Sequence, residues 1–255
     1  MSGHSHWSTI RRKKEANDAK RGKIFTKIAR EIVIAVREGG GDDPETNFQL
    51  RTVLDKARDA EMPNDNIERA IKRGTGEDKS GEEISQVWYE GYGPNGVAMM
   101  IDVLTENRNR SVAAVRHALT RVGGSMASPG AVAWQFERKG LINVASDKVD
   151  FFDLFEAAAE AGAEDVVEGE NGDPHEIYTA VEDLHEVSEA LQDGGIEVAD
   201  PKLVMTPQNE VSLDTNDSVR ILKLISEIED LDDVRQVYSN LEMTEEAVEA
   251  YAAQV

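Results

Sequence analysis

Residues 16–41 read ANDAKRGKIFTKIAREIVIAVREGGG, and this stretch decides the fold of the N-terminal part of the chain. At about 100° per residue it predicts a helix from about Ala16 to Arg37 with two nearly opposite stripes. The apolar stripe consists of Phe25, Ile28, Ile32 and Val36. The basic stripe consists of Lys20, Lys23, Lys27, Arg30 and Arg37, whereas Arg21 lies near the apolar side. Three successive glycines, residues 39–41, end the helix because they lose too much backbone entropy to continue it.

Two further helices follow, and their short connections predict that all three pack as a small bundle. One helix covers residues 47–61 and is ended by Pro63. The other begins with Asn64 or Asp65 as its cap and is closed by Gly74, the usual residue after a last turn.

From Glu82 onward the sequence alternates between strand and helix patterns. Two strands within residues 87–103 flank the stretch 91–96, whose Gly, Pro and Asn residues are typical of a hairpin turn. Further strands are predicted over 131–136, 141–144, 165–168, 177–181, 196–204, 210–213 and 233–239. Helices are predicted over 110–122, 151–161, 182–192 and 218–228. Strands in hairpin-like pairs mixed with helices favour an α+β fold over a doubly wound parallel sheet.

Charge is distributed unevenly along the chain. The net charge of the 255 residues is −22, yet residues 1–37 contain ten Lys or Arg against three Asp or Glu, a charge of +7. Residues 38–79 carry −4 and residues 80–255 carry −25. A solvated surface explains the acidic part, and adaptation to high salt or recruitment of a protein partner would explain it too.

Several classes of protein are not expected from this sequence. The chain has no cysteine, which excludes disulfides and thiolate chemistry and fits a reducing cytoplasm. No apolar run approaches the length of a membrane span, and the polar, basic residues 1–14 do not resemble a signal peptide. A P-loop and the usual hydrolase and zinc-protease motifs are missing, and His4 with His6 is too small a ligand set for a metal. We therefore expect a cytoplasmic, non-enzymatic protein without a metal or cofactor.

The N-terminal segment, residues 1–37, has the composition of a nucleic-acid-binding element. His4, His6 and Trp7 offer flat faces for unstacked bases, and the basic run 11–14 can release counterions from phosphate. The alternatives are a charged terminus without a role, or a tryptophan that docks on a core. Because the rest of the chain repels phosphate, a narrow basic surface favours insertion into a groove or an RNA crevice.

A second basic pair lies at the predicted start of the helix over 110–122. Asn107 or Asn109 can cap that helix, and the neighbouring arginines can bind phosphate near its N-terminus or serve in ion pairs. The candidate nucleic-acid-binding residues are therefore His4, His6, Trp7, Arg11, Arg12, Lys13, Lys14, Lys20, Lys23, Lys27, Arg30, Arg108 and Arg110.

Several stretches closely resemble the YebC family over essentially the whole chain. They are Gly3-His4-Ser5 with Trp7, residues 19–27 (AKRGKIFTK), Met62-Pro63 with residues 66–71 (NIERAI), residues 89–94 (YEGYGP), residues 107–110 (NRNR) and residues 231–234 (LDDV). His6 departs from the lysine that family members commonly carry. The acidic part also carries more negative charge than the family suggests.

The resemblance implies a multidomain α+β protein: an N-terminal helical bundle and two α+β domains, the third inserted into the second. On this sequence the domains would be 1–79, then 80–130 with 206–255, and 131–205. The family is described as probable DNA-binding transcriptional regulators. It also includes a mitochondrial translational activator of cytochrome oxidase subunit I, and bacterial members are implicated in helping ribosomes through proline-rich stretches.

Three hypotheses therefore remain open. The first is a regulator of gene expression that binds DNA. The second is a ribosome-associated factor that inserts its basic N-terminal tail into ribosomal RNA, which the charge asymmetry favours. The third is an acidic protein-interaction scaffold. Oligomeric state cannot be inferred from the sequence.

Overall fold

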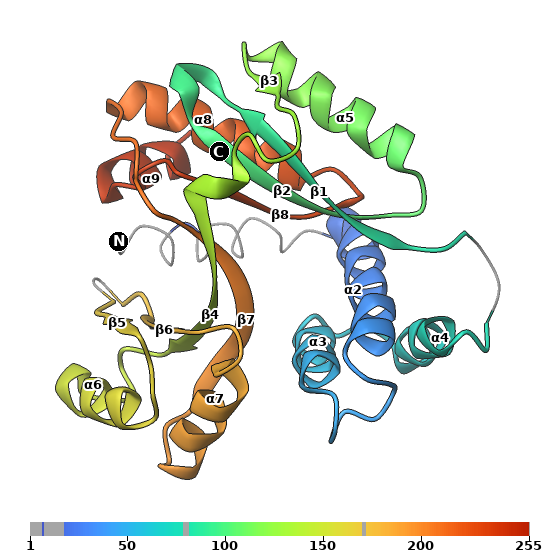
Figure 1. Cartoon of the computed structure of the whole chain (residues 1–255), viewed down its shortest axis with the longest axis vertical. Coiled ribbons are helices and arrows are strands. Elements are labelled where there is room, and N and C mark those ends of the chain that lie inside the picture. The colour runs from blue at the N-terminus through green and yellow to red at the C-terminus, as the bar shows by residue number, and fades with distance from the viewer. Residues whose placement is uncertain (1–6, 8–17, 79–81, 170–171, 255) are drawn as a thin grey trace.

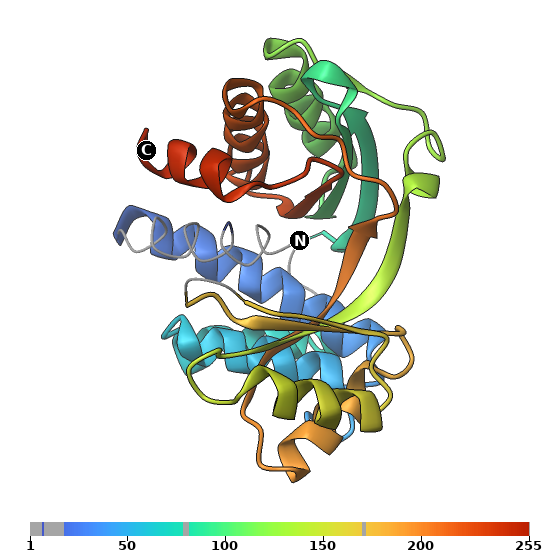
Figure 2. The ribbon, with the colours of Figure 1, turned by 90° about the vertical axis from the view of Figure 1, so that its left-hand side faces the viewer.

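The computed structural model describes residue 7 and residues 18–78, 82–169 and 172–254. Figure 1 shows a helical bundle at the lower right, a sheet with its helices above it, and a second sheet with its own helices at the lower left. Turned by 90°, the view in Figure 2 shows α2 (Asp18–Glu38) between the upper part and the inserted part. The expected class, a helical bundle with two α+β units of which one is inserted into the other, is confirmed.

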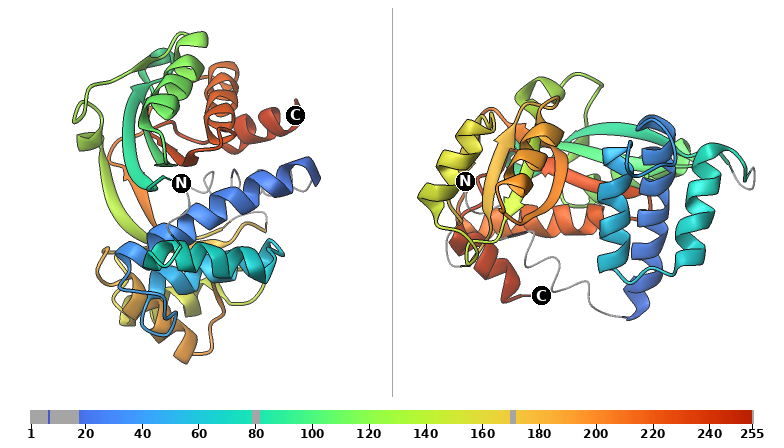
Figure 3. Two further views of the ribbon diagram at one scale, coloured as in Figure 1. Left: turned by 90° about the vertical axis from the view of Figure 1, so that its right-hand side faces the viewer. Right: turned by 90° about the horizontal axis from the view of Figure 1, so that it is seen from below.

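The bundle consists of α2, α3 (Phe48–Asp59) and α4 (Asn64–Thr75). Seen from below, these three helices lie side by side (Figure 3, right). The apolar stripe of α2 packs against α3 and α4 in a core that includes Ile28, Ile32, Val36, Leu50, Leu54 and Ala70. Gly74 lies within α4, not after it. This position requires glycine because a Cβ there would approach the Val36 Cβ to 2.6 Å. The left-handed residue that ends α4 is Gly76.

Asn47 joins the first two helices of the bundle. Its side-chain oxygen accepts a hydrogen bond from the Leu50 amide at 3.0 Å, which caps α3. Its amide nitrogen donates to the carbonyls of Ala35 and Gly41, at 2.8 and 2.7 Å. One buried side chain therefore satisfies backbone groups at the end of α2 and at the start of α3.

The first sheet has the order β3-β1-β2-β8 and is antiparallel. Its strands are β1 (Ser85–Tyr92), β2 (Ala98–Thr105), β3 (Ser125–Met126) and β8 (Val234–Ser239). On one face pack α5 (Arg108–Arg121) and α8 (Thr215–Glu229), with α9 (Glu245–Ala252) against α8. Alternate residues of β2 serve the two faces, since Met99 and Ile101 point to the helices and Ala98 and Met100 to the other side.

The second sheet has the order β5-β6-β4-β7 and is also antiparallel. Its strands are β4 (Phe136–Val144), β5 (Asp165–Val167), β6 (His175–Thr179) and β7 (Val198–Pro207). The helices α6 (Phe151–Glu160) and α7 (Leu184–Asp193) pack on it. The chain leaves the first sheet after β3, forms the whole second sheet and returns to α8. The exact domain boundaries stay a prediction.

Glu90 fixes the point where the chain leaves the first sheet. This buried carboxylate accepts three backbone hydrogen bonds, from Gly130 at 2.6 Å, Val132 at 2.6 Å and Ala133 at 3.0 Å. Burial alone would raise the pKa of Glu90, but these three donors lower it. The carboxylate thus ties the segment that precedes β4 to strand β1.

Other sequence expectations for secondary structure were also wrong. Residues 131–136 do not form a separate strand, since a short 3-10 helix (Ala133–Gln135) lies there. Strand β4 then continues without a break through residues 138–140, which the sequence had placed between two strands. Gly140 lies within β4, and this position requires glycine because a Cβ there would lie 2.2 Å from the Thr179 hydroxyl oxygen. Residues 210–213 form only an isolated bridge at Val211, and α9 was not anticipated.

Candidate nucleic-acid interface

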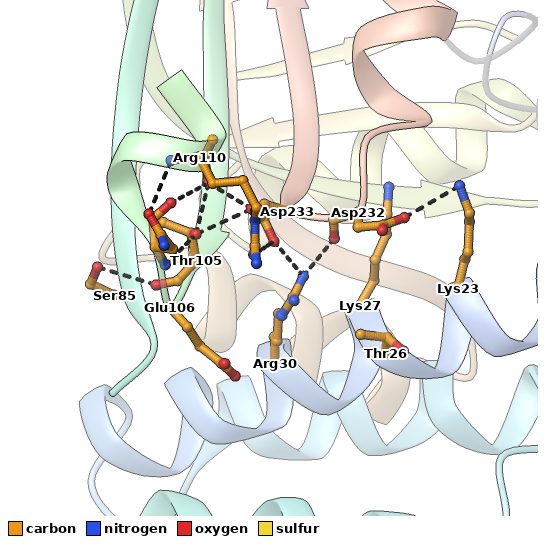
Figure 4. Close-up of polar contacts among 12 residues, drawn as sticks. Lys23, Thr26, Lys27, Arg30, Ser85, Thr105, Glu106, Arg110, Asp232 and Asp233 are labelled. Carbon is orange, nitrogen blue, oxygen red and sulfur yellow. Dashed lines mark hydrogen bonds and ion pairs between the residues drawn. The ribbon is translucent and has the colours of Figure 1, made fainter. Parts of the chain in front are cut away.

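The basic stripe of α2 faces the acidic turn between α8 and β8 (Figure 4). Lys23 lies 3.3 Å from an Asp232 carboxylate oxygen, and the Lys27 ammonium donates to the Glu229 carbonyl at 2.5 Å. The Arg30 guanidinium donates to the Asp232 carbonyl at 2.6 Å and lies 3.1 Å from the Asp233 carboxylate. Three of the predicted phosphate-binding cations therefore join the bundle to the first α+β unit.

Asp233 is the centre of this contact, which we call the interdomain ionic cluster (Lys23, Lys27, Arg30, Arg110, Asp232, Asp233). The Arg110 guanidinium donates to both Asp233 carboxylate oxygens, with its shortest contact at 2.8 Å. The hydroxyls of Ser111 and Thr105 lie 2.6 and 3.2 Å from the same carboxylate. Only 8% of the Asp233 side chain is exposed. Burial would raise the pKa of Asp233, but the Ser111 hydroxyl and the two guanidinium groups lower it.

The cluster is built by the cap of α5. The side-chain oxygen of Asn107 accepts from the Arg110 amide at 3.0 Å, so the helix begins where the sequence predicted a cap. This places Arg110 and Ser111 in the first turn, beside Asp233. Arg108 points elsewhere and donates to the Ser85 hydroxyl at 3.2 Å. Of the two arginines singled out here, Arg110 therefore belongs to the cluster and Arg108 does not.

Exposure separates the cations of the cluster into two groups. The side chains of Lys23 and Arg110 are about three-fifths exposed, so their charges lie at the surface even though they are paired. Arg30 is only 13% exposed and is enclosed between α2 and the acidic turn. The idea of a fully open basic stripe on α2 is therefore wrong, because the turn at 229–233 covers part of it.

Trp7 is not the exposed ring that the sequence suggested. It is 5% exposed and packs in the core of the first α+β unit, with its ring centroid 4.8 Å from that of Tyr251 on α9. The alternative, a tryptophan that docks on a core, is the one observed. His4, His6, Arg11, Arg12, Lys13 and Lys14 lie outside the described residues, as does the side chain of Lys20.

Sequence reasoning missed the outer face of α5. The helix contains four arginines, Arg108, Arg110, Arg116 and Arg121, and no acidic residue. Only the first two were singled out, because they lie close together at the helix start. Counting charges over the whole helix would have revealed the other two, since α5 is strongly basic within a strongly acidic part of the chain.

A metal centre or a membrane span would each require a particular grouping of the described residues. Among them, no group of three or more His, Cys, Asp or Glu side chains is arranged to hold a metal ion. Within the same ranges, no helix is both long enough and apolar enough to cross a bilayer.

Two family models together match nearly the whole chain. The one described as "TACO1/YebC protein N-terminal domain" matches residues 5–77, and the one described as "TACO1/YebC second and third domain" matches residues 84–241. The chain belongs to the YebC family. This confirms the resemblance inferred from the sequence motifs.

Relatives of this YebC-family protein are similar over their full length. A protein of Bifidobacterium animalis subsp. lactis is 51% identical over 240 residues, covering 94% of each chain. A protein of Fervidobacterium nodosum is 48% identical over 256 residues, covering 100% of this chain and 99% of its own. Both are named "Probable transcriptional regulatory protein". The crystal structure of a conserved hypothetical protein from Aquifex aeolicus has a TM-score of 0.81 and 45% identity, covering 89% of this chain and 93% of that one.

Proposed function

We propose that this YebC-family protein is a non-enzymatic regulator of gene expression that binds nucleic acid through its N-terminal basic segment, residues 1–37. The observation that carries the proposal is the charge of +7 on this segment against −25 on residues 80–255. The net charge attracts phosphate to the first segment and repels it from most of the second, so the strongest binding is expected on a narrow surface. The names of the relatives agree with a regulatory role.

The interdomain ionic cluster limits which cations of α2 serve this function. Arg30 is enclosed and bonded to the acidic turn, so its role is to dock the bundle. Lys23 is exposed and paired only across a surface contact of 3.3 Å, which contributes at most about 1 kcal/mol. Lys23 can therefore exchange Asp232 for a phosphate at little cost. We assign the contact with nucleic acid to the basic run 11–14, to Lys20 and to Lys23.

The experiment removes the positive charges of residues 11–14 and keeps the buried side chain of Trp7. A variant with Arg11, Arg12, Lys13 and Lys14 replaced by alanine leaves Trp7 in place, whereas a deletion would also remove a core side chain. We expect weaker binding to a mixed-sequence DNA duplex and an RNA duplex, with a log–log salt slope that falls by roughly one unit for each lost phosphate contact.

A matched variant controls for net charge. Arg69, Lys72, Arg138 and Lys148 are all exposed, and replacing them by alanine removes the same number of cations from other surfaces. If the control variant loses as much affinity as the tail variant, binding follows net charge only and the assignment to residues 1–37 is wrong.

A role on the ribosome is the second candidate, and the same charge distribution favours it. Residues 80–255, with a charge of −25, are repelled by the phosphates of a long duplex. The N-terminal basic segment can instead enter a crevice in folded RNA while residues 80–255 stay outside. This function would make the protein a translation factor that assists the synthesis of difficult, proline-rich peptides. It predicts that the wild type sediments with ribosomes at low salt and that the tail variant does not. Equal sedimentation of both proteins would remove this candidate.

A further inference from the structure

We infer that the exposed face of α5 is a second nucleic-acid contact, which binds the backbone of double-helical RNA. The inference rests on the proposed function, but it uses a different surface and different residues. The surface consists of Asn109, Arg110, Arg116, His117 and Arg121, all of which are exposed.

The first observation is the concentration of positive charge. Residues 80–255 contain only eleven Lys or Arg against 36 Asp or Glu, yet four of the eleven lie within the 14 residues of α5. Two more, Arg220 and Lys223, lie on α8 of the same layer. If basic residues were spread evenly, a helix of this length would carry about one. The face of α5 is therefore a local exception in a surface that otherwise repels phosphate.

Helix stability does not explain this pattern. The N-terminus of a helix carries a partial positive charge, so acidic residues stabilise the first turn and basic ones oppose it. The first turn of α5 contains Arg108 and Arg110 and no acidic residue. Arg121 in the last turn does suit the helix dipole, but Arg116 lies in the middle and gains nothing from it.

The geometry of α5 separates a packing side from a binding side. Ser111, Val115, Ala118 and Leu119 are buried toward the sheet. On the opposite side, at about 100° per residue, Asn109, Ala113 and Thr120 form a central strip, with Arg116 at one edge and Arg110, His117 and Arg121 at the other.

The cations on this face differ in their pairing. Arg121 pairs with Glu227 on α8, and Arg110 pairs with Asp233. Within the part of the chain that the structure describes, the side chains of Arg116 and His117 have no hydrogen bond or ion pair. Arg116 is thus an exposed, hydrated cation that can bind a phosphate without breaking an ion pair, and the test therefore uses this residue.

The shape of the face favours RNA over DNA. The minor groove of A-form RNA is wide and shallow, and proteins contact its 2′-hydroxyls and flanking phosphates by shape. A strip with Arg116 at one edge and Arg110 and Arg121 at the other matches that arrangement, since Asn109 can bond a 2′-hydroxyl while arginines reach the phosphates on either side. The major groove of B-form DNA is about 8.5 Å deep. A helix packed flat on a sheet would have to bring its acidic surroundings against both DNA strands to enter it.

The test compares Arg116→Glu with Arg138→Glu. Both arginines are exposed, neither side chain has a hydrogen bond or ion pair with another described residue, and each substitution changes the net charge equally. The probes are a 20-base-pair RNA duplex and a DNA duplex of the same sequence. We expect Arg116→Glu to weaken binding to the RNA duplex about tenfold and to lower its salt slope by roughly one unit, and Arg138→Glu to change both much less.

Each outcome has one meaning. Equal affinities of the two variants for RNA overturn the inference while leaving the proposed function intact, provided that the wild type binds. A loss of DNA binding as large as the loss of RNA binding overturns the assignment to RNA. If the wild type binds neither duplex, the proposed function fails and this inference fails with it. An unfolding temperature equal to that of the wild type confirms that both variants are folded in the binding measurements.

Discussion

The two basic helices of this protein, α2 and α5, use their charges differently. On α2, three cations of the basic stripe contact the turn at 229–233, and one of them is almost enclosed. On α5, Arg110 and Ser111 of the first turn contact Asp233 of the same turn, and the outer face of the helix remains exposed. A sequence pattern shows where cations gather, but only the tertiary structure shows which of them are already neutralised by carboxylates of the same chain. The predictions below test this difference, from the largest expected effect to the smallest.

The largest effect concerns Trp7, which packs in the core of the first α+β unit. Trp7→Ala should lower the free energy of unfolding by about 3–5 kcal/mol, since it empties a large buried site beside Tyr251. Trp134→Ala is the matched control, because Trp134 is 67% exposed and should cost less than about 1 kcal/mol. Urea unfolding measures both. Equal losses would mean that Trp7 is not part of the core.

The next effect concerns the interdomain ionic cluster. Asp233→Asn keeps the shape of the side chain but leaves Arg30 without a compensating charge in an enclosed position, so it should cost about 2 kcal/mol. Asp232→Asn should cost less than about 1 kcal/mol, because the Lys23–Asp232 pair is exposed. A greater loss at Asp232 than at Asp233 would contradict the central place of Asp233 in the contact.

The cluster should also respond to acid. The pKa of Asp233 is lower in the folded protein than its ordinary value, so its stabilisation is fully present above the unfolded-state pKa of about 3.9. It is lost as the pH falls through the lower folded-state pKa. The difference in unfolding free energy between the wild type and Asp233→Asn should therefore be constant from about pH 7 to 5 and shrink below about pH 4. A difference that shrinks already near neutral pH would point to another titrating group.

The smallest effect is expected on α5. Arg116→Ala should change the free energy of unfolding by less than about 0.5 kcal/mol, because Arg116 is exposed and has no partner among the described residues. Arg121→Ala removes an ion pair with Glu227 and should cost slightly more. A large destabilisation by Arg116→Ala would show that this arginine has a structural role, and would weaken its use as a binding residue.

Local features of the fold could be predicted from the sequence. The apolar stripe of α2 and the glycines after it depend on residues close together in the chain, and both were predicted. An asparagine cap for α5 was also predicted, at Asn107 or Asn109, and the structure shows Asn107. Strand β4 was divided at Arg138–Gly140 because polar residues and a glycine resemble a turn. The true reason for Gly140 is contact with Thr179 and Leu184, which lie far away in the sequence.

The candidate site was predicted less well, for a similar reason. The contact of α2 with residues 229–233 joins segments about 200 residues apart, and no local pattern reveals such a pairing. Trp7 likewise meets a helix near the other end of the chain, which was itself not predicted. The positive charge of α5 could have been predicted from the sequence, but the solvent exposure of its outer face could not.

Crosslinking in cells followed by sequencing tests the central claim most directly, namely that this protein acts on nucleic acid through its N-terminal basic segment. The wild type should recover nucleic acid, and the variant with alanine at positions 11–14 should recover much less at equal protein levels. We predict enrichment of ribosomal or other double-helical RNA over promoter DNA. Recovery of neither nucleic acid by the wild type, or equal recovery by the two proteins, would contradict the account.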